Sequence, residues 1–192
     1  MLMKKLCLFI GLILISLLGI AQVTSNSATL TLGTLPVITT QPVSQVACLG
    51  TSATFTIVAT GTAPLSYQWR KGSTNISGAT NSTYTIDSVK VSDGNTGSYS
   101  CVVICSCGSV TSNSVGLTVN LPPVITVQPA NLNLCPGTMA VFSVTATGTG
   151  LTYQWRKNGT NLTGATSTNL IFMSINASSA GTYDVIVGGT CQ

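Results

Sequence analysis

Side chains that could support catalysis are scarce in this sequence. It contains no histidine and no glutamate, and its side-chain acids are Asp87, Asp93 and Asp184. A Ser-His-Asp arrangement is therefore impossible, although the count alone does not exclude a pair of catalytic carboxylates. Calcium-binding loops of the Asp-x-Asp-x-Asp type are also absent. We expect that the chain is not an enzyme and that it needs no cofactor.

Cysteine is the residue type with the widest choice of chemistry here. Apart from Cys7 in the apolar first segment, the cysteines are Cys48, Cys101, Cys105, Cys107, Cys135 and Cys191. A thiolate metal site would use the close pair Cys105 and Cys107, but no histidine is present and no Cys-x-x-Cys pair recurs with zinc-finger spacing. An even number of cysteines in an exported chain instead favours disulfides. We therefore expect disulfides and no metal.

Two Arg-Lys pairs are the candidate binding residues. Arg70-Lys71 and Arg156-Lys157 could attract an acidic glycan or a partner protein, although charged residues at the end of a solvated strand would look the same. Beyond the first 21 residues, five basic residues stand against three acids. So small an excess argues against the basic surface of a nucleic-acid-binding protein, and we expect no nucleic-acid partner.

The first 21 residues are typical of a secretory signal peptide. Two lysines precede an apolar run from Leu6 to Ile20, and Gly19-Ile20-Ala21 offers a cleavage site between small residues. The run is shorter than the roughly 20 residues that span a bilayer. Cys7 also lies too early for lipid attachment at the cleavage point. We expect a soluble chain without a membrane span that begins near Gln22 and is secreted or held at the cell surface.

A long internal repeat sets the architecture. Residues 37–42, Val-Ile-Thr-Thr-Gln-Pro, return as Val-Ile-Thr-Val-Gln-Pro at residues 124–129. The segment Tyr-Gln-Trp-Arg-Lys occurs unchanged at residues 67–71 and 153–157. A repeat of this length indicates two copies of one structural module.

Each copy alternates apolar and polar residues as half-buried strands do. Phe55, Ile57 and Ala59 share one face of residues 53–60, and the second copy repeats this pattern from Phe142 onward. Glycines punctuate the short apolar runs, and no run has a helical period. The pattern predicts an all-β sandwich or barrel in each copy.

These residues resemble the tandem immunoglobulin-like repeats of bacterial secreted and cell-surface proteins. Trp69 and Trp155 match the core tryptophan of strand C, and Tyr99 and Tyr183 match the tyrosine corner at the start of strand F. The resemblance implies an all-β fold of tandem immunoglobulin-like β-sandwich domains after an N-terminal signal peptide.

Both copies depart from the antibody pattern at the inter-sheet disulfide. The strand-B position holds no cysteine in either copy, so Cys101 in strand F of the first copy lacks a cross-sheet partner and should be a buried thiol. A different pair of cysteines recurs, one before strand B and one after strand F. We expect the disulfides Cys48–Cys107 and Cys135–Cys191, with Cys105 as an alternative partner for Cys48.

The edges of the repeat are uneven. Residues 110–119, which should form the last strand, G, of the first copy, have a near-copy at residues 23–32, and the second copy reaches only to Gln192, before its own strand G. A partial gene from a longer array explains both edges. Donation of residues 23–32 to the second domain of another chain explains them as well and would give head-to-tail self-association. The expected divisions are a signal peptide (1–21), an orphan strand-G-like segment with a linker (22–36), a first domain (37–120) and a second domain that lacks its last strand (121–192).

The resemblance is specific for fold but not for function, because such domains serve adhesion, spacing and ligand binding alike. We expect a non-catalytic extracellular module protein with a structural-spacer or adhesion role, which contacts a protein or a glycan at the cell surface. The alternatives are a ligand- or glycan-binding receptor fragment and the accessory domains of a larger secreted enzyme.

Overall fold

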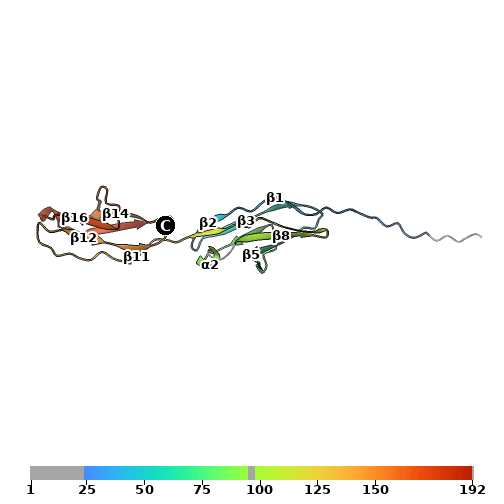
Figure 1. The fold of residues 1–192 in the computed structure, drawn as a ribbon, viewed down its shortest axis with the longest axis horizontal. Helices are drawn as coiled ribbons and strands as arrows, with labels where there is room; N and C mark the ends of the chain where they lie inside the picture. Colours follow the sequence, from blue (N-terminus) through green and yellow to red (C-terminus); the bar gives the residue numbers. More distant parts are fainter. Residues whose placement is uncertain (1–23, 95–97, 192) are drawn as a thin grey trace, which may run out of the picture. The chain divides into compact units, whose positions relative to one another are not determined.

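The computed structural model describes residues 24–94 and 98–191 (Figure 1). The chain divides into two compact units, one that ends at Leu32 and one that begins at Gly33. Of the first unit, residues 24–32 form no helix or strand and are exposed. The expected signal peptide lies outside the described residues.

Residues 37–120, here called the first module, form two groups of paired strands around one core. Their elements are β1 (Val37–Thr40), β2 (Gln45–Cys48), β3 (Ala53–Thr56), β4 (Val58–Thr60), β5 (Ser66–Lys71), β6 (Thr74–Asn75), β7 (Thr83–Ile86), α2 (Val91–Gly94), β8 (Tyr99–Cys105), β9 (Gly108–Thr111) and β10 (Leu117–Asn120). One group pairs β1 with β4 and β3 with β7, and the other has the order β6-β5-β8-β9. A separate parallel pair joins β2 to β10.

Alternation of side chains directs one face of each strand into the core of the first module. In β3, Ala53 and Phe55 are buried whereas the two threonines that alternate with them are exposed. Trp69 on β5 is fully buried, and its indole N–H donates to the carbonyl of Asn81 over 2.9 Å. Phe55 stacks on Tyr99 with ring centroids 4.7 Å apart. The predicted core position of Trp69 is therefore confirmed.

Residues 124–191, here called the second module, repeat most of these pairings. Their elements are β11 (Val124–Val127), β12 (Ala140–Ser143), β13 (Thr145–Thr147), β14 (Thr152–Lys157), β15 (Thr160–Asn161), β16 (Asn169–Phe172), the 3-10 helix η1 (Ala177–Ser179) and β17 (Tyr183–Gly188). β11 pairs with β13, β12 pairs with β16, and β14 lies between β15 and β17. Trp155 is fully buried and donates to the carbonyl of Ser167 over 2.9 Å, which repeats the environment of the first tryptophan.

The second module differs from the first along one edge. Within residues 124–191, no described strand corresponds to β2, β9 or β10, and β17 pairs only with β14. Phe142 and Tyr183 are half-buried, whereas their counterparts Phe55 and Tyr99 are 0% and 1% exposed. The core of the second module is therefore more open beside Tyr183 than the matching region of the first module.

Candidate functional site

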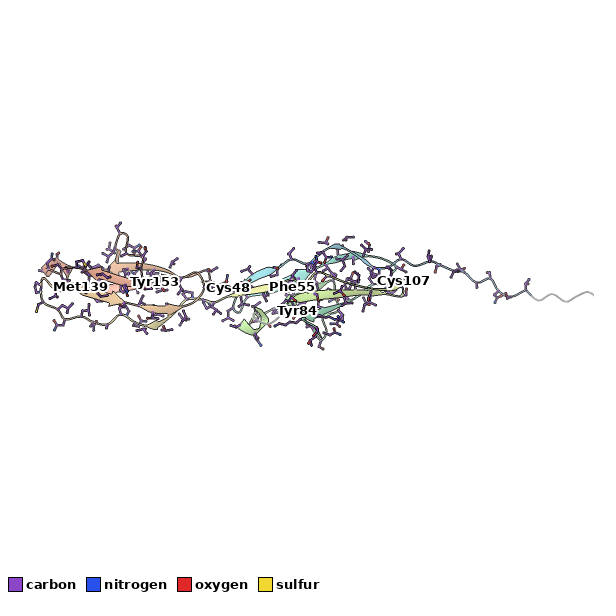
Figure 2. All side chains as sticks on the ribbon, viewed as in Figure 1. Cys48, Phe55, Tyr84, Cys107, Met139 and Tyr153 are labelled. Carbon is purple, nitrogen blue, oxygen red and sulfur yellow. A yellow bond between two sulfur atoms is a disulfide. The ribbon has the colours of Figure 1, made fainter. Side chains whose placement is uncertain are left out.

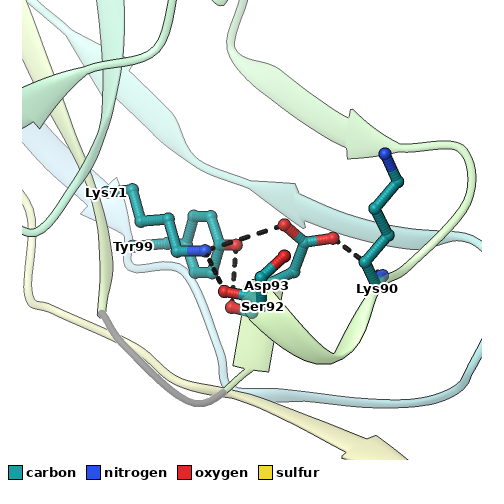
Figure 3. Close-up of polar contacts among 5 residues, drawn as sticks. All are labelled: Lys71, Lys90, Ser92, Asp93 and Tyr99. Carbon is teal, nitrogen blue, oxygen red and sulfur yellow. Dashed lines mark hydrogen bonds and ion pairs between the residues drawn. The ribbon is translucent and has the colours of Figure 1, made fainter.

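The basic pairs occupy the last two positions of β5 and β14. Because successive strand residues point to opposite faces of a sheet, the arginine and the lysine of each pair are separated. Lys71 lies over the ring of Tyr99, with its Nζ 5.7 Å from the ring centroid, and donates to the backbone carbonyl of Ser92 over 2.6 Å (Figure 3). The same ammonium lies 3.6 Å from Oδ1 of Asp93. Through these contacts Lys71 stabilises the first module, to which it belongs.

Asp93 fixes the turn that leads to the tyrosine corner. Its Oδ2 accepts a hydrogen bond from the backbone N–H of Lys90 over 2.8 Å, and its backbone carbonyl accepts one from the Tyr99 hydroxyl over 3.0 Å (Figure 3). Burial and the negative charge of Asp93 raise the pKa of Tyr99 to about 12. The phenol therefore keeps its proton at neutral pH and remains a donor.

The second module repeats this arrangement with different partners. Lys157 lies over the ring of Tyr183, with its Nζ 5.7 Å from the centroid, and donates to the backbone carbonyl of Ser178. The Tyr183 hydroxyl donates to the backbone carbonyl of Ser179 over 2.6 Å. Because the contacts recur although the acid does not, the lysine and the tyrosine form a structural unit of the module.

The two arginines also bind within their own modules. Arg70 Nε donates to Oδ1 of Asn75 over 2.8 Å. Arg156 forms an ion pair with Asp184, and its Nε donates to Oδ1 of that residue over 3.1 Å. The hydrogen bond from Arg156, with a smaller contribution from its charge, lowers the pKa of Asp184. Each residue of the expected basic surface is thus engaged in its own module, and a binding role for these residues stays a prediction.

The disulfide differs from the expected pairs. Cys48 is bonded to Cys191, with Cα atoms 5.8 Å apart, and Cys107 and Cys135 are free. The expected Cys48–Cys107 pair fails because of strand direction. Cys48 ends β2, and β3 and β4 then carry the chain toward the other end of the module, where Cys107 lies (Figure 2). The eight extended residues 53–60, from the start of β3 to the end of β4, span about 26 Å, whereas a disulfide joins Cα atoms roughly 4.4–6.8 Å apart.

The same argument separates Cys135 from Cys191. Cys135 lies in the turn before β12, where the Thr138 hydroxyl donates to its carbonyl over 2.7 Å. Cys191 follows β17 at the opposite end of β12 and β13, where the backbone N–H of Thr190 donates to the carbonyl of Thr149 over 2.9 Å. The expected Cys135–Cys191 pair is therefore replaced by a disulfide between the two modules.

The four free cysteines of the described residues lie in different environments. Cys101 is 0% exposed, and burial raises the pKa of its thiol to about 11, which confirms the predicted buried thiol. Cys105 is half-buried, and its sulfur accepts a hydrogen bond from the backbone N–H of Cys107 over 3.3 Å. Cys107 and Cys135 are exposed. Among the described cysteines, these last two are therefore the thiols most accessible to reagents.

A groove lies beside the open core of the second module. Its volume is about 360 Å³, and its walls combine the half-buried aromatic rings with the turn before β12 and the segment around η1. The lining residues are Leu132, Asn133, Leu134, Pro136, Ala140, Phe142, Phe172, Ile175, Asn176, Ala177, Ser179, Ala180, Gly181 and Tyr183.

The acids do not come together in the part of the chain that the structure describes. Asp87 follows β7, Asp93 belongs to α2 and Asp184 lies on β17 of the other module. No group of three His, Cys, Asp or Glu residues in the described ranges is arranged to hold a metal ion. Among the same residues, no helix has the length and apolar character needed to cross a membrane.

Sequence reasoning missed the disulfide between the modules, whereas the shorter second copy of the repeat indicated an open part of its core, where the groove lies. The direction of each predicted strand is the signal that places Cys48 and Cys107 at opposite ends of a sandwich. For the groove, the signal is the near-copy of residues 110–119 at residues 23–32, because it shows which apolar side chains normally cover this part of the core.

Residues 36–104 match the family model described as immunoglobulin domain. Among solved structures, an I67–I69 fragment of titin is 21% identical with a TM-score of 0.71, and the match covers 84% of this chain and 62% of the fragment. Sidekick-1 immunoglobulin domains 1–4 are 18% identical with a TM-score of 0.66, over 82% of this chain and 46% of that one. At these identities the similarity concerns the fold alone.

Two curated proteins have a higher sequence identity to this chain than these solved structures have. Endoglucanase C of Cellulomonas fimi is 38% identical over 120 residues, which is 60% of this chain and 11% of the endoglucanase. The highly immunogenic outer capsid protein of Enterobacteria phage T4 is 30% identical over 143 residues, which is 67% of this chain and 35% of the capsid protein. The matches thus span about a tenth and a third of these relatives.

Proposed function

We propose that this chain, which carries immunoglobulin-like domains in tandem, is a non-catalytic structural spacer of an extracellular protein. The disulfide between Cys48 and Cys191 carries this proposal, because among the described residues it joins the first module to the second covalently, in addition to the main chain. A covalent connection of this kind limits the relative motion of two modules. Such a connection suits a pair of domains that holds neighbouring parts of a protein at a fixed distance, rather than a pair that opens and closes.

The use of aromatic and basic residues supports the same role. Both tryptophans are fully buried, and the two lysines of the basic pairs lie on the tyrosine corners. A carbohydrate site generally needs exposed rings on which sugars stack, and the described aromatic residues are buried or half-buried. The side chains that would recognise a ligand are therefore largely committed to the modules themselves.

The second candidate is an accessory domain pair of a secreted glycan-degrading enzyme. The 38% identity to part of endoglucanase C favours it. In that setting the spacer role is retained, because the modules would hold another domain at a distance from a surface or substrate. The distinguishing property is direct binding to a polysaccharide, which the spacer role does not require.

Two measurements test the proposal. Spin labels on Thr54 of β3 and Asn169 of β16, introduced as unnatural amino acids, should give a narrow distance distribution in the oxidised protein and a broad one in the Cys48→Ser/Cys191→Ser variant. Equal widths would contradict a fixed spacing. Separately, the protein should pass unretained through cellulose, chitin and heparin columns. Retention that is lost on Arg70→Ala/Arg156→Ala substitution would favour a glycan-binding module instead.

A further inference from the structure

The turn between β8 and β9 carries two thiols at one end of the first module (Figure 2). Cys105 is the last residue of β8 and pairs with Gly108, the first residue of β9, so Ser106 and Cys107 are the two turn residues. Two Cα steps of about 3.8 Å that bend within such a turn bring their ends closer together than their sum. The Cα atoms of Cys105 and Cys107 therefore lie within the roughly 4.4–6.8 Å that a disulfide joins.

The sulfur of Cys105 is aimed at the backbone of Cys107. The backbone N–H of Cys107 donates to Sγ of Cys105 over 3.3 Å. Sγ of Cys107 is three bonds from that nitrogen, so rotation about the Cα–Cβ bond of Cys107 carries it toward Cys105. An exposed side chain exchanges between its staggered rotamers quickly. The two sulfur atoms can therefore meet without any change in the pairing of β8 with β9.

The two thiols differ in their access to solvent. Cys107 is exposed, whereas Cys105 is half-buried and its S–H donates to the backbone carbonyl of Thr34 over 3.7 Å. A dissolved reagent therefore meets Cys107 first. The carbonyl of Thr34 also accepts the backbone N–H of Thr62 over 3.3 Å. Oxidation of Cys105 removes the weak S–H donor and leaves that carbonyl with a hydrogen bond.

The other described cysteines are less well placed to react with either thiol of the turn. Cys101 lies four residues earlier on β8, about 13 Å from Cys105 at the rise of a strand, and it is 0% exposed. Cys48 is already part of the disulfide between the modules. Cys135 precedes β12 of the second module. Within the described part of the chain, the nearest partner of each turn thiol is therefore the other one.

The second module has the corresponding turn with a single thiol. In the repeat, Cys191 matches Cys107 and Gly189 matches Cys105, because the two cysteines each lie eight residues after the tyrosine of the corner. Cys191 forms the disulfide with Cys48. The glycine gives this disulfide no neighbouring thiol that could attack it. The first module thus adds a second thiol beside a position at which the fold otherwise forms a lasting disulfide.

We propose that Cys105 and Cys107 form a thiol–disulfide exchange site for low-molecular-weight disulfides. Cys107 reacts with the disulfide first, and Cys105 then resolves the mixed disulfide into a Cys105–Cys107 disulfide within the turn. The role of Cys105 is the same whichever thiol is joined to Cys107, because Cys105 attacks the sulfur of Cys107 itself. The site adds a redox chemistry that the spacer role does not require. The exchange is stoichiometric, so it is compatible with a non-catalytic spacer.

Oxidised glutathione illustrates the two steps. The Cys107 thiolate attacks one sulfur of the oxidant, forms a mixed disulfide and releases one glutathione thiolate. The Cys105 thiolate then attacks Sγ of Cys107, and the second glutathione thiolate leaves. The two protein thiols lose two protons and two electrons, and one oxidised glutathione becomes two reduced molecules.

The short tether between the two thiols decides the second step. One residue separates them, so the local concentration of the Cys105 thiol at the mixed disulfide exceeds the millimolar range that short flexible linkers provide. Cys135 provides the contrast, because it is exposed and has no free thiol beside it among the described residues. A glutathione joined to Cys135 leaves only when a thiol from solution attacks it. We therefore expect Cys107 to lose its glutathione and Cys135 to keep it.

The test treats the full chain, purified in the dithiol form of the turn, with oxidised glutathione. The reaction is stopped with acid at successive times, and the peptides are mapped by mass spectrometry. We expect glutathione to remain on Cys135, whereas Cys105 and Cys107 together lose two hydrogens, form an internal disulfide and release two glutathione molecules. The Cys135→Ser variant removes the other exposed thiol and should give a monomer on a non-reducing gel.

The resolving step is tested by Cys105→Ser, whose hydroxyl keeps a donor for the carbonyl of Thr34. This variant should keep glutathione on Cys107 at least tenfold longer than the wild type. Cys135→Ser is the matched control and should form the internal disulfide at the wild-type rate. Lasting glutathione on Cys107 of the wild type, an unchanged lifetime in Cys105→Ser, or a peptide that joins Cys107 to a different cysteine would overturn the proposal. The spin-label distances depend on neither thiol of the turn, so the spacer role is tested separately.

Discussion

The Cys48–Cys191 disulfide should remove most of the chain from the path of a mechanical load. When force is applied between a handle before Gly33 and a handle after Cys191, tension passes along the residues up to Cys48, crosses the disulfide and leaves at Cys191. Residues 49–190 then carry no load. The bridge contributes a Cα–Cα separation of 5.8 Å in place of the 143 positions that it bypasses.

The expected extensions differ about ninefold between the two redox states. At roughly 3.3–3.6 Å per residue, the 16 residues from Gly33 to Cys48 extend to about 50–60 Å. Reduction adds the bypassed segment, which at the same rise contributes about 470–515 Å. Unfolding of the reduced protein should also occur in two steps, because each module has its own hydrophobic core.

Single-molecule force spectroscopy measures these lengths directly. The wild-type protein should show short extensions without reductant and the long release after reductant is added, and Cys48→Ser/Cys191→Ser should behave as the reduced protein in both conditions. Cys107→Ser/Cys135→Ser keeps the disulfide and is the matched control, with wild-type behaviour. Release of several hundred ångströms from the oxidised wild type would refute the reasoning.

Three further predictions concern single residues. Cys101 should react with iodoacetamide at pH 8 at least a hundredfold more slowly in the native protein than in denaturant, since burial raises its pKa to about 11 and blocks access, as mass spectrometry can show. Trp155→Ala should destabilise the second module by about 3–5 kcal/mol, because it removes a fully buried side chain, and urea unfolding should then show an early second-module transition. The lowered pKa of Asp184 means that its ion pair with Arg156 stabilises the second module at neutral pH. That contribution should be lost as the pH falls through the folded pKa of Asp184, and thermal unfolding of Asp184→Asn should lack this part of the acid dependence.

Each of these has an internal control. Cys107 is exposed and should be alkylated promptly in the native protein, so equal rates for Cys101 would contradict its burial. Trp69→Ala should shift the transition of the first module instead, and a shift of both modules by either variant would mean that their cores are not independent. An unchanged acid dependence in Asp184→Asn would show that the ion pair contributes nothing.

Much of the fold follows from local sequence pattern. The alternation around Phe55 identifies a half-buried strand, and the repeated Tyr-Gln-Trp-Arg-Lys segment places a buried tryptophan in each module. These features depend on residues close together in the sequence, so a single chain is enough to recognise them. The burial of Cys101 follows in the same way from its position in a strand whose cross-sheet partner is not a cysteine.

The parts that sequence reasoning missed depend on which end of a module each residue occupies. Cys48 and Cys107 precede and follow strands in a way that suggests a pair, yet the strands between them run the length of the module. The partners of the basic pairs are hidden from local sequence for a related reason. Adjacent residues such as Arg70 and Lys71 belong to opposite faces of a strand, and their partners come from other segments, which the pair itself does not reveal.

The same disulfide turns most of the protein into a covalent ring. The ring runs from Cys48 through both modules to Cys191 and closes through two sulfur atoms, with a sequence separation of 143. A protease that cuts one exposed loop inside this ring opens it without releasing a fragment, and the two new chain ends stay on one molecule. Loss of a piece requires a second cut or a reductant, so in an oxidising environment a single nick leaves the two modules connected.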